Sequence, residues 1–317
     1  MKGASKQVNL ISMRRSYHHR EGFKLFLLSI PFLAFTFIFS YMPLYGWSYA
    51  FFDYRLGLKL SDTQFVGLQH FIQMFQSRAL RNDLIRVMTN TLGMSFIGLA
   101  TSWLPMLFAI LLAEIKSKKY RRTVQTITTI PNFISWVLVY ALAFAMFSIG
   151  DGAVNRILIN LGIVDEGINF LARRDGVWIM MWLLGTWKGL GWGAILYIAA
   201  MSGIDPELYE AAAVDGAGRF RRIRYITIPN LMPTFVVLFI LGISNFLNTG
   251  IDQYFLFDNA MTRARIEVLD LYMYNIGMLG KQVSYTTAVG MLRTFISLIL
   301  LFSANTLSKA IRGEKVF

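Results

Sequence analysis

Six blocks of mostly apolar residues divide this chain of 317 residues, and they limit what it can fold into. An apolar stretch of about 20 residues is the length that a helix needs to cross the hydrocarbon core of a bilayer. Only 15% of the residues are charged, whereas soluble domains carry about 25%. The blocks cover residues 25–45, 91–112, 126–148, 177–201, 231–247 and 286–307. We therefore predict an all-α membrane protein with six transmembrane helices.

The blocks predict one transmembrane domain, residues 25–307, between an N-terminal tail of residues 1–24 and a C-terminal tail of residues 308–317. The first block follows a basic stretch, as the apolar part of a secretory signal does. It is longer than a typical signal segment and lacks an Ala-x-Ala-like cleavage site. We expect it to remain as a helix.

The net charge is +13, which in a soluble protein would suggest nucleic acid as a partner. Here the basic residues gather beside the apolar blocks, in residues 2–24, 116–122, 219–224 and 309–315. Lys and Arg accumulate in cytoplasmic loops of membrane proteins. The pattern therefore indicates membrane lipid, and no nucleic acid, as the surroundings of this chain. It places both termini and the loop 203–229 in the cytoplasm.

The connections on the opposite side are longer and mix aromatic, glycine and polar residues. They cover residues 46–90, 150–176 and 248–285. Short interfacial helices, a docking rim and ordinary loops all fit this composition.

Residue types that carry chemistry are scarce. The chain has no cysteine and three histidines, so disulfides, thiolate sites and a histidine metal site are not indicated. No Gly-x-x-x-x-Gly-Lys-Ser/Thr sequence is present, and we expect no ATP bound to this chain. A membrane-embedded enzyme would need clustered His, Asp or Glu within the blocks, and none appears. We predict no catalytic residues, no metal site and no cofactor in this chain.

The loop 203–229 begins with a helix signal. Asp205 can accept hydrogen bonds from free N–H groups, and Pro206 suits the first helical position. Leu208, Ala211 and Ala212 then recur at helical spacing and make a small apolar face. Gly216 can adopt the left-handed conformation that ends a helix. A second, basic helix is expected from Arg219 into the fifth block.

The spacing within this loop is specific: Glu-Ala-Ala at 210–212, three residues, Gly216, nine residues, and Ile-Thr-Ile-Pro at 226–229. It resembles the EAA loop of ABC importer permeases, although that family has Leu where this chain has Ile228. The resemblance implies a coupling helix that docks on a cytoplasmic ATPase. The coupling residues that it implies are Glu210, Ala211, Ala212, Asp215, Gly216, Arg219, Ile226 and Pro229. The arginines at 219, 221, 222 and 224 either contact the ATPase or only anchor the loop in the cytoplasm.

The resemblance extends over nearly the whole chain, to the polysaccharide branch of the carbohydrate importer permeases. The stretches that carry it include RTVQTITTIPNFISW at 122–136, WKGLGW at 187–192 and GIDQ at 250–253. It implies the type I importer fold in a bacterial inner membrane. It also implies a second homologous permease, two ATPase subunits that bind ATP and Mg, an extracytoplasmic solute-binding protein and an oligosaccharide substrate. Transport would proceed by alternating access.

Two charged residues lie inside predicted spans, where charges are costly and are functional candidates by default. Lys188 lies in the fourth block and Arg293 in the sixth. An arginine facing the pore could bind a carboxylate through two parallel hydrogen bonds, which suggests an acidic, alginate-like oligosaccharide. A structural ion pair or a contact with the partner permease is the alternative explanation for Arg293. Further candidates for the solute pathway are Trp182, Trp187, Trp192, Asn245 and Asn248.

An ion-coupled secondary transporter is the alternative from a different class. Such a protein typically carries acidic groups near the membrane midplane. Glu114 lies only at the cytoplasmic edge of the second block, and this argues against the alternative.

Overall fold

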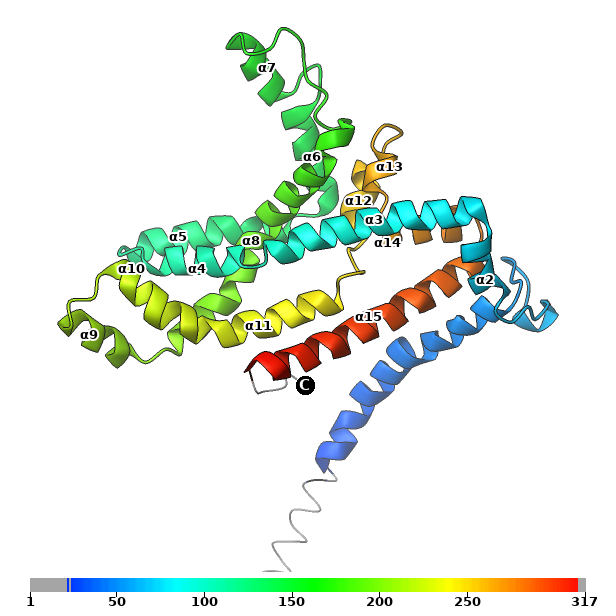
Figure 1. The fold of residues 1–317 in the computed structure, drawn as a ribbon, viewed down its shortest axis with the longest axis horizontal. Coiled ribbons are helices and arrows are strands. Elements are labelled where there is room, and N and C mark those ends of the chain that lie inside the picture. The colour runs from blue at the N-terminus through cyan, green and yellow to red at the C-terminus, as the bar shows by residue number, and fades with distance from the viewer. Residues whose placement is uncertain (1–21, 23, 313–317) are drawn as a thin grey trace, which may run out of the picture.

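The computed structural model describes residue 22 and residues 24–312, and this part of the chain is almost entirely helical (Figure 1). An isolated antiparallel bridge between Phe52 and Phe65 is the only extended pairing among these residues. The all-α prediction is therefore confirmed. Most of the predicted N-terminal tail and the last five residues lie outside the described residues.

The first long helix of the described residues covers Lys24–Phe51 and ends in the π segment η1 (Phe37–Tyr41) and the 3₁₀ segment η2 (Met42–Phe51). The elements that follow up to the loop 203–229 are η3 (Leu60–Asp62), α2 (Gln69–Gln76), α3 (Arg78–Ala100), α4 (Leu104–Ala113), α5 (Lys118–Thr129), η4 (Ile130–Phe133), α6 (Trp136–Phe147), α7 (Ala153–Asn160), η5 (Arg174–Gly176) and α8 (Val177–Ser202). The remaining elements are α9 (Pro206–Val214), α10 (Arg219–Arg222), η6 (Ile223–Thr227), α11 (Ile228–Ser244), α12 (Asp252–Phe257), α13 (Arg263–Ile266), α14 (Leu269–Tyr274), η7 (Asn275–Leu279) and α15 (Val283–Arg312). Short helices thus occupy parts of all three predicted outer connections.

In the described part of the chain, four helices are long and apolar enough to cross a membrane: Lys24–Phe51, Arg78–Ala113, Arg219–Ser244 and Val283–Thr306. A fifth candidate is a pair of helices, Lys118–Phe133 and Trp136–Phe147, that is bent by 105°. The helix α8 covers the predicted span 177–201 but is not among these candidates, and its glycines, tryptophans and Lys188 reduce its hydropathy. The count of six spans stays a prediction.

The predicted straight span over residues 126–148 is interrupted, and the local sequence explains why. Pro131 has no N–H to donate and does not favour continuation of the preceding helix. Ser135 then starts α6 as its N-cap, because its hydroxyl accepts a hydrogen bond from Leu138 N at 3.4 Å. The two parts therefore meet at a sharp bend.

The helix α8 runs through the middle of the molecule and packs against α4, α5 and α11. The core at one of its ends joins Ala194 and Tyr197 of α8 to Ala109 of α4 and Leu231 of α11. At the other end, Val177 and Met181 pack with buried residues of α3, α6, α12 and α13. Its position lets α8 join the helices on both sides of the bend.

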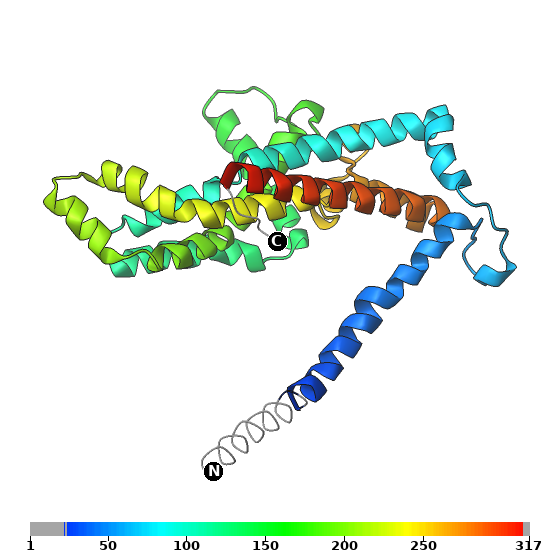
Figure 2. The ribbon, with the colours of Figure 1, turned by 60° about the horizontal axis from the view of Figure 1, so that its bottom comes forward.

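The N-terminal helix diverges from the bundle, and both views show it leaving near the start of α15 (Figures 1 and 2). Its most apolar window buries none of its residues. Its C-terminal end is different, because Ala50 is fully buried and Trp47 lies 6.3 Å from the ring of Phe295. At the two ends of the long axis lie α9 and the segment around α2 (Figure 1).

Candidate functional site

The helix α9 and its boundaries follow the geometry that the sequence predicts. The side chain of Asp205 accepts a hydrogen bond from Glu207 N at 3.0 Å, and Pro206 is the first helical residue. The helix ends at Val214, and Gly216 adopts a φ of 75°. Ala217 N then donates to Ala212 O at 2.8 Å, which closes the helix end. A side chain at position 216 would strain this turn.

The helix α9 is also largely exposed. None of its residues is buried, and Val214 is 88% exposed. Of the residues predicted to couple to an ATPase, Ala212 and Ile226 are half-buried, and the rest are exposed: Glu210, Ala211, Asp215, Gly216, Arg219 and Pro229. This surface is open to a partner.

Two side-chain contacts connect this exposed region to the bundle. The Arg219 side chain donates from Nε to Glu114 Oε2 at 2.6 Å and from Nη2 to the Glu114 carbonyl at 2.7 Å. The hydroxyl groups of Tyr209 and Thr227 lie 3.0 Å apart. Of the four arginines in the loop, Arg219 alone forms an ion pair within the described part of the chain. Its guanidinium is directed at α4 rather than away from the protein.

Lys188 lies against the bend between α5 and α6. Its ammonium donates to the carbonyls of Pro131 at 3.2 Å and Asn132 at 2.7 Å, and it lies 5.6 Å from the centre of the Trp136 ring. The Pro131 carbonyl also accepts from Ile134 N at 3.2 Å, whereas Lys188 is the donor to the Asn132 carbonyl at this helix break. An ammonium in a predicted span needs acceptors, and the bend provides them.

The neighbours of Lys188 in the sequence contact the same bend. A side chain at Gly191 would lie 2.3 Å from the carbonyl oxygen of Thr128, so only glycine permits this approach of the two helices. The ring of Trp192 packs edge-on against Phe133, with 5.6 Å between the ring centres. The WKGLGW stretch therefore packs α8 against the bend. Trp187 is 42% exposed.

Trp182 lies at a different place. Its Nε1 donates to Thr101 Oγ1 at 2.9 Å, at the turn between α3 and α4. It lines a cavity of about 280 Å³ together with Gly185 and Gln253. The predicted tryptophan candidates are therefore divided between two sites.

A larger cavity of about 590 Å³ lies where the end of α11 approaches η7 and α15. Asn245, Asn248 and Arg293 all line it, as do Trp47 and several hydroxyl side chains. The structure thus brings three of the seven predicted solute-pathway residues together. Trp182, Trp187, Lys188 and Trp192 are not among its lining residues.

Arg293 forms an ion pair as well as lining this cavity. Its Nη1 lies 2.5 Å from Asp270 Oδ1, and both side chains are mostly buried. The second carboxylate oxygen, Oδ2, accepts from Gly250 N at 3.0 Å and from Thr249 Oγ1 at 3.4 Å. Asp270 therefore joins α14, the segment after α11 and α15 at one wall of the cavity.

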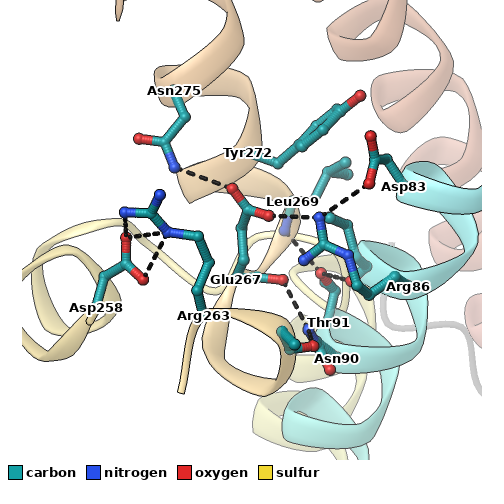
Figure 3. A network of polar contacts seen from close by, with 12 residues as sticks. Asp83, Arg86, Asn90, Thr91, Asp258, Arg263, Glu267, Leu269, Tyr272 and Asn275 are labelled. Atoms are coloured by element: carbon teal, nitrogen blue, oxygen red, sulfur yellow. Dashed lines mark hydrogen bonds and ion pairs between the residues drawn. The ribbon is translucent and has the colours of Figure 1, made fainter. Parts of the chain in front are cut away.

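A network of polar contacts around Glu267 fixes α13 and α14 against α3 (Figure 3). We call it the Glu267 network. Glu267 pairs with Arg86 at 2.8 Å and accepts from Asn275 Nδ2 at 2.9 Å. Asn90 Nδ2 donates to the Glu267 carbonyl at 3.0 Å, and Thr91 Oγ1 accepts from Leu269 N at 2.8 Å. Asp270 follows directly, so this network places the carboxylate that holds Arg293.

The chain was compared with known families and proteins. A family model described as "Binding-protein-dependent transport system inner membrane component" matches residues 105–313. The chain belongs to this family. It is 37% identical over 294 residues to Protein LplB of Bacillus subtilis (strain 168), covering 92% of this chain and 91% of LplB. It is 36% identical over 294 residues to a polygalacturonan/rhamnogalacturonan transport system permease protein, YteP, of the same strain, covering 92% of this chain and 90% of YteP.

Solved structures of a bacterial alginate ABC transporter also match. One of them, in complex with a periplasmic protein that carries an alginate pentasaccharide, has a TM-score of 0.83 and 32% identity over 94% of this chain and 98% of that chain. The chain is therefore an ABC importer permease of the type I fold, a pore-forming subunit whose ATPase activity lies in separate subunits. This excludes the ion-coupled alternative. The multi-pass inner-membrane assignment follows from the family as well.

The match to the family model begins in α4, so it includes the loop around α9 and all residues that line the large cavity except Trp47, but not α3. Sequence reasoning on this permease missed Asp270 and Glu267. An available signal was an acid within an apolar run, as in Val-Leu-Asp-Leu-Tyr at 268–272. A charge that is buried there needs a basic partner. The sequence did not show which arginine it would be.

Proposed function

We propose that this permease imports oligosaccharides that carry carboxylate groups, and that an extracytoplasmic solute-binding protein delivers them. The observation that carries the proposal is the similarity over 94% of the chain to the alginate transporter. The named substrate of YteP, polygalacturonan/rhamnogalacturonan, supports the same solute class. The substrates of both relatives include uronic acids, whose carboxylates are ionised at neutral pH.

The permease would work as one half of a pore, together with a second homologous permease. Two cytoplasmic ATPase subunits would bind ATP and Mg, and α9 would receive their movement. The exposure of α9 supports this role, because a docking helix must leave its surface free for a partner. The distribution of basic residues supports cytoplasmic termini.

The large cavity is the proposed place of the solute. Amide groups such as those of Asn245 and Asn248 can both donate and accept hydrogen bonds, as sugar hydroxyls require. Arg293 uses Nη1 for Asp270, and its guanidinium has further donors for a solute carboxylate. In this arrangement Asp270 orients Arg293, and it also reduces the net positive charge at the cavity.

The solute class can be tested by uptake into proteoliposomes that contain the complete transporter and its binding protein. Oligogalacturonides are compared with the same oligosaccharides after methyl esterification, which removes the charge and keeps the sugar chain. We expect ATP-dependent uptake of the acidic form and little uptake of the ester. Equal uptake of both forms, or uptake of neutral oligosaccharides alone, would contradict an acidic substrate.

A further inference from the structure

The region from Asp205 to Arg222, which we call the elbow, comprises α9, the turn at Gly216 and α10. The elbow runs directly into α11, because Arg219–Ser244 is one continuous helix. Within the described residues, side-chain hydrogen bonds also connect the elbow to the end of α4 and to the start of α11. Arg219 contacts Glu114 at the end of α4, and Tyr209 contacts Thr227 at the start of α11. None of the residues of α9 is buried, so core packing does not hold this helix against the bundle. A displacement of α9 can therefore be transmitted through these hydrogen bonds.

Arg219 contacts both the side chain and the main chain of Glu114. Glu114 is the C-cap residue of α4. Arg219 donates both to its carboxylate and to its main-chain carbonyl, so the guanidinium is fixed to the helix end as well as to a side chain. Carbonyls at helix C-termini have no helical donor, and a cation is favourable there. Movement of Arg219 is therefore passed to the backbone of α4.

The contact of Tyr209 reaches the second helix. Thr227 is buried and is the N-cap of α11, at the end of the π segment η6. The far end of α11 carries Asn245, which lines the large cavity. A displacement of Thr227 along the axis of α11 would thus reach the cavity.

We infer that the Arg219–Glu114 and Tyr209–Thr227 contacts are two links through which the elbow moves α4 and α11 together. This inference rests on the proposed function of α9 as the site that an ATPase moves. Arg219 is then a positioning residue within the permease, and its guanidinium does not serve as a contact to the ATPase. The side chains of Arg219 and Glu114 are 59% and 36% exposed, and exposed ion pairs contribute little to stability. Variants of this pair should therefore fold.

The test uses the complete transporter in proteoliposomes and measures the ATP hydrolysed for each solute imported. We expect Arg219→Ala to leave the ATPase subunits bound and to raise this ratio about tenfold, within the usual range for loss of coupling between two sites. Glu114→Ala should act in the same direction. Because one contact is removed in both cases, the double variant should be much less impaired than the product of the single effects. Lys116→Ala removes a neighbouring charge with no ion pair among the described residues, and it should match the unaltered protein.

Two outcomes would overturn the inference. If Arg219→Ala releases the ATPase subunits, the arginine contacts the motor directly. If the two single effects multiply in the double variant, Arg219 does not act through Glu114. For Tyr209→Phe we expect a smaller rise of the ratio, with Tyr225→Phe, an exposed tyrosine, as the matched control. A Tyr209→Phe transporter with an unchanged ratio would remove the second link.

A cross-link adds an independent measurement, because the chain contains no cysteine. Glu114→Cys and Arg219→Cys are introduced together and joined by a short bifunctional reagent. If the contact moves as one body, transport by the cross-linked protein should be at least that of the same variant before linking. Transport that stops on linking and returns on cleavage of the reagent would show that the contact must open, which contradicts a rigid link.

The proposed function is tested separately by Glu210→Lys, which places the opposite charge on the docking surface. If this variant loses the ATPase subunits while the Arg219 and Glu114 variants keep normal coupling, only the inference fails. If Glu210→Lys retains both binding and transport, docking through α9 fails.

Discussion

The elbow leaves the residues of α9 in solvent, whereas the Glu267 network encloses a carboxylate whose side chain is only 6% exposed. Each half of the comparison has an arginine and a glutamate in contact. Arg219 and Glu114 lie at the surface, and Arg86 and Glu267 lie between α3 and α14. An arginine–glutamate ion pair therefore has a different role in each region. We expect changes in the elbow to affect coupling more than stability, and changes in the network to affect stability first.

The largest expected effect is at Glu267. Replacing it with alanine leaves Asn275 without this acceptor and leaves Arg86 with Asp83 as its remaining carboxylate partner. We expect a loss of about 3 kcal/mol of stability, near the lower end for a broken buried ion pair, because Arg86 keeps Asp83. Thermal unfolding of the purified complex measures this loss. Glu267→Gln keeps the shape and the bond to Asn275 and should lose less. Equal unfolding temperatures for Glu267→Ala and the unaltered protein would contradict the role of the network.

The second largest loss of stability is expected at Lys188, which contacts the bend between α5 and α6. Lys188→Met leaves the Asn132 carbonyl without its donor, whereas the Pro131 carbonyl keeps a hydrogen bond from Ile134 N. We expect a cost of about 2 kcal/mol, within the usual range for an unsatisfied buried group. Lys188→Arg keeps the charge and should be milder. The measurement is again thermal unfolding, together with solute uptake. If Lys188 instead binds solute, uptake should fall in Lys188→Met without any loss of stability.

A smaller effect is expected at Arg293. Replacement by glutamine keeps a donor at the cavity but removes the charge that a carboxylate would meet. We expect uptake of acidic oligosaccharides to fall about tenfold relative to neutral ones, which corresponds to about 1.4 kcal/mol. An equal loss for both would show that the Arg293–Asp270 ion pair is structural only. Asp270→Asn is the matched variant, since it removes the negative charge of the ion pair and leaves the arginine in the sequence.

The smallest effect on stability is expected at Asp205 in the elbow. Asp205→Ala removes the N-cap of α9 and should cost about 1 kcal/mol of local helix stability. Because α9 buries no residue, hydrogen exchange in α9 should increase while the unfolding temperature of the complex stays nearly constant. Asp205→Ser keeps a capping oxygen and is the control. A large drop in unfolding temperature would mean that α9 contributes to the core.

The same comparison explains how far the sequence could predict the structure. The elbow is predicted almost completely, because its N-cap at Asp205 and its turn at Gly216 depend on neighbouring residues. The Glu267 network joins residues that are about 180 positions apart, as Asn90 and Glu267 are. A single sequence contains no signal for such a pairing. The bend at Pro131 had a local signal that was not used.

The solute-pathway residues were predicted from the sequence only in part. Arg293 was found because a charge in an apolar block is conspicuous, but Asp270 was not identified as its partner. Lys188 was found by the same argument, and its acceptors are main-chain carbonyls, which any sequence contains. Residue type therefore predicts that a charged group must be satisfied. It does not predict the group that satisfies it.

The contact between Lys188 and the bend also has a consequence for biosynthesis. Pro131 precedes Lys188 by 57 residues, so the ribosome makes the acceptors well before the donor. If α8 enters lipid as predicted, its ammonium would find these acceptors at once, provided that the bend between α5 and α6 has already formed. A delay in forming the bend would leave the Lys188 ammonium without acceptors among the acyl chains. For the predicted span α8, the order of synthesis would thus supply acceptors for Lys188 before this charge meets lipid.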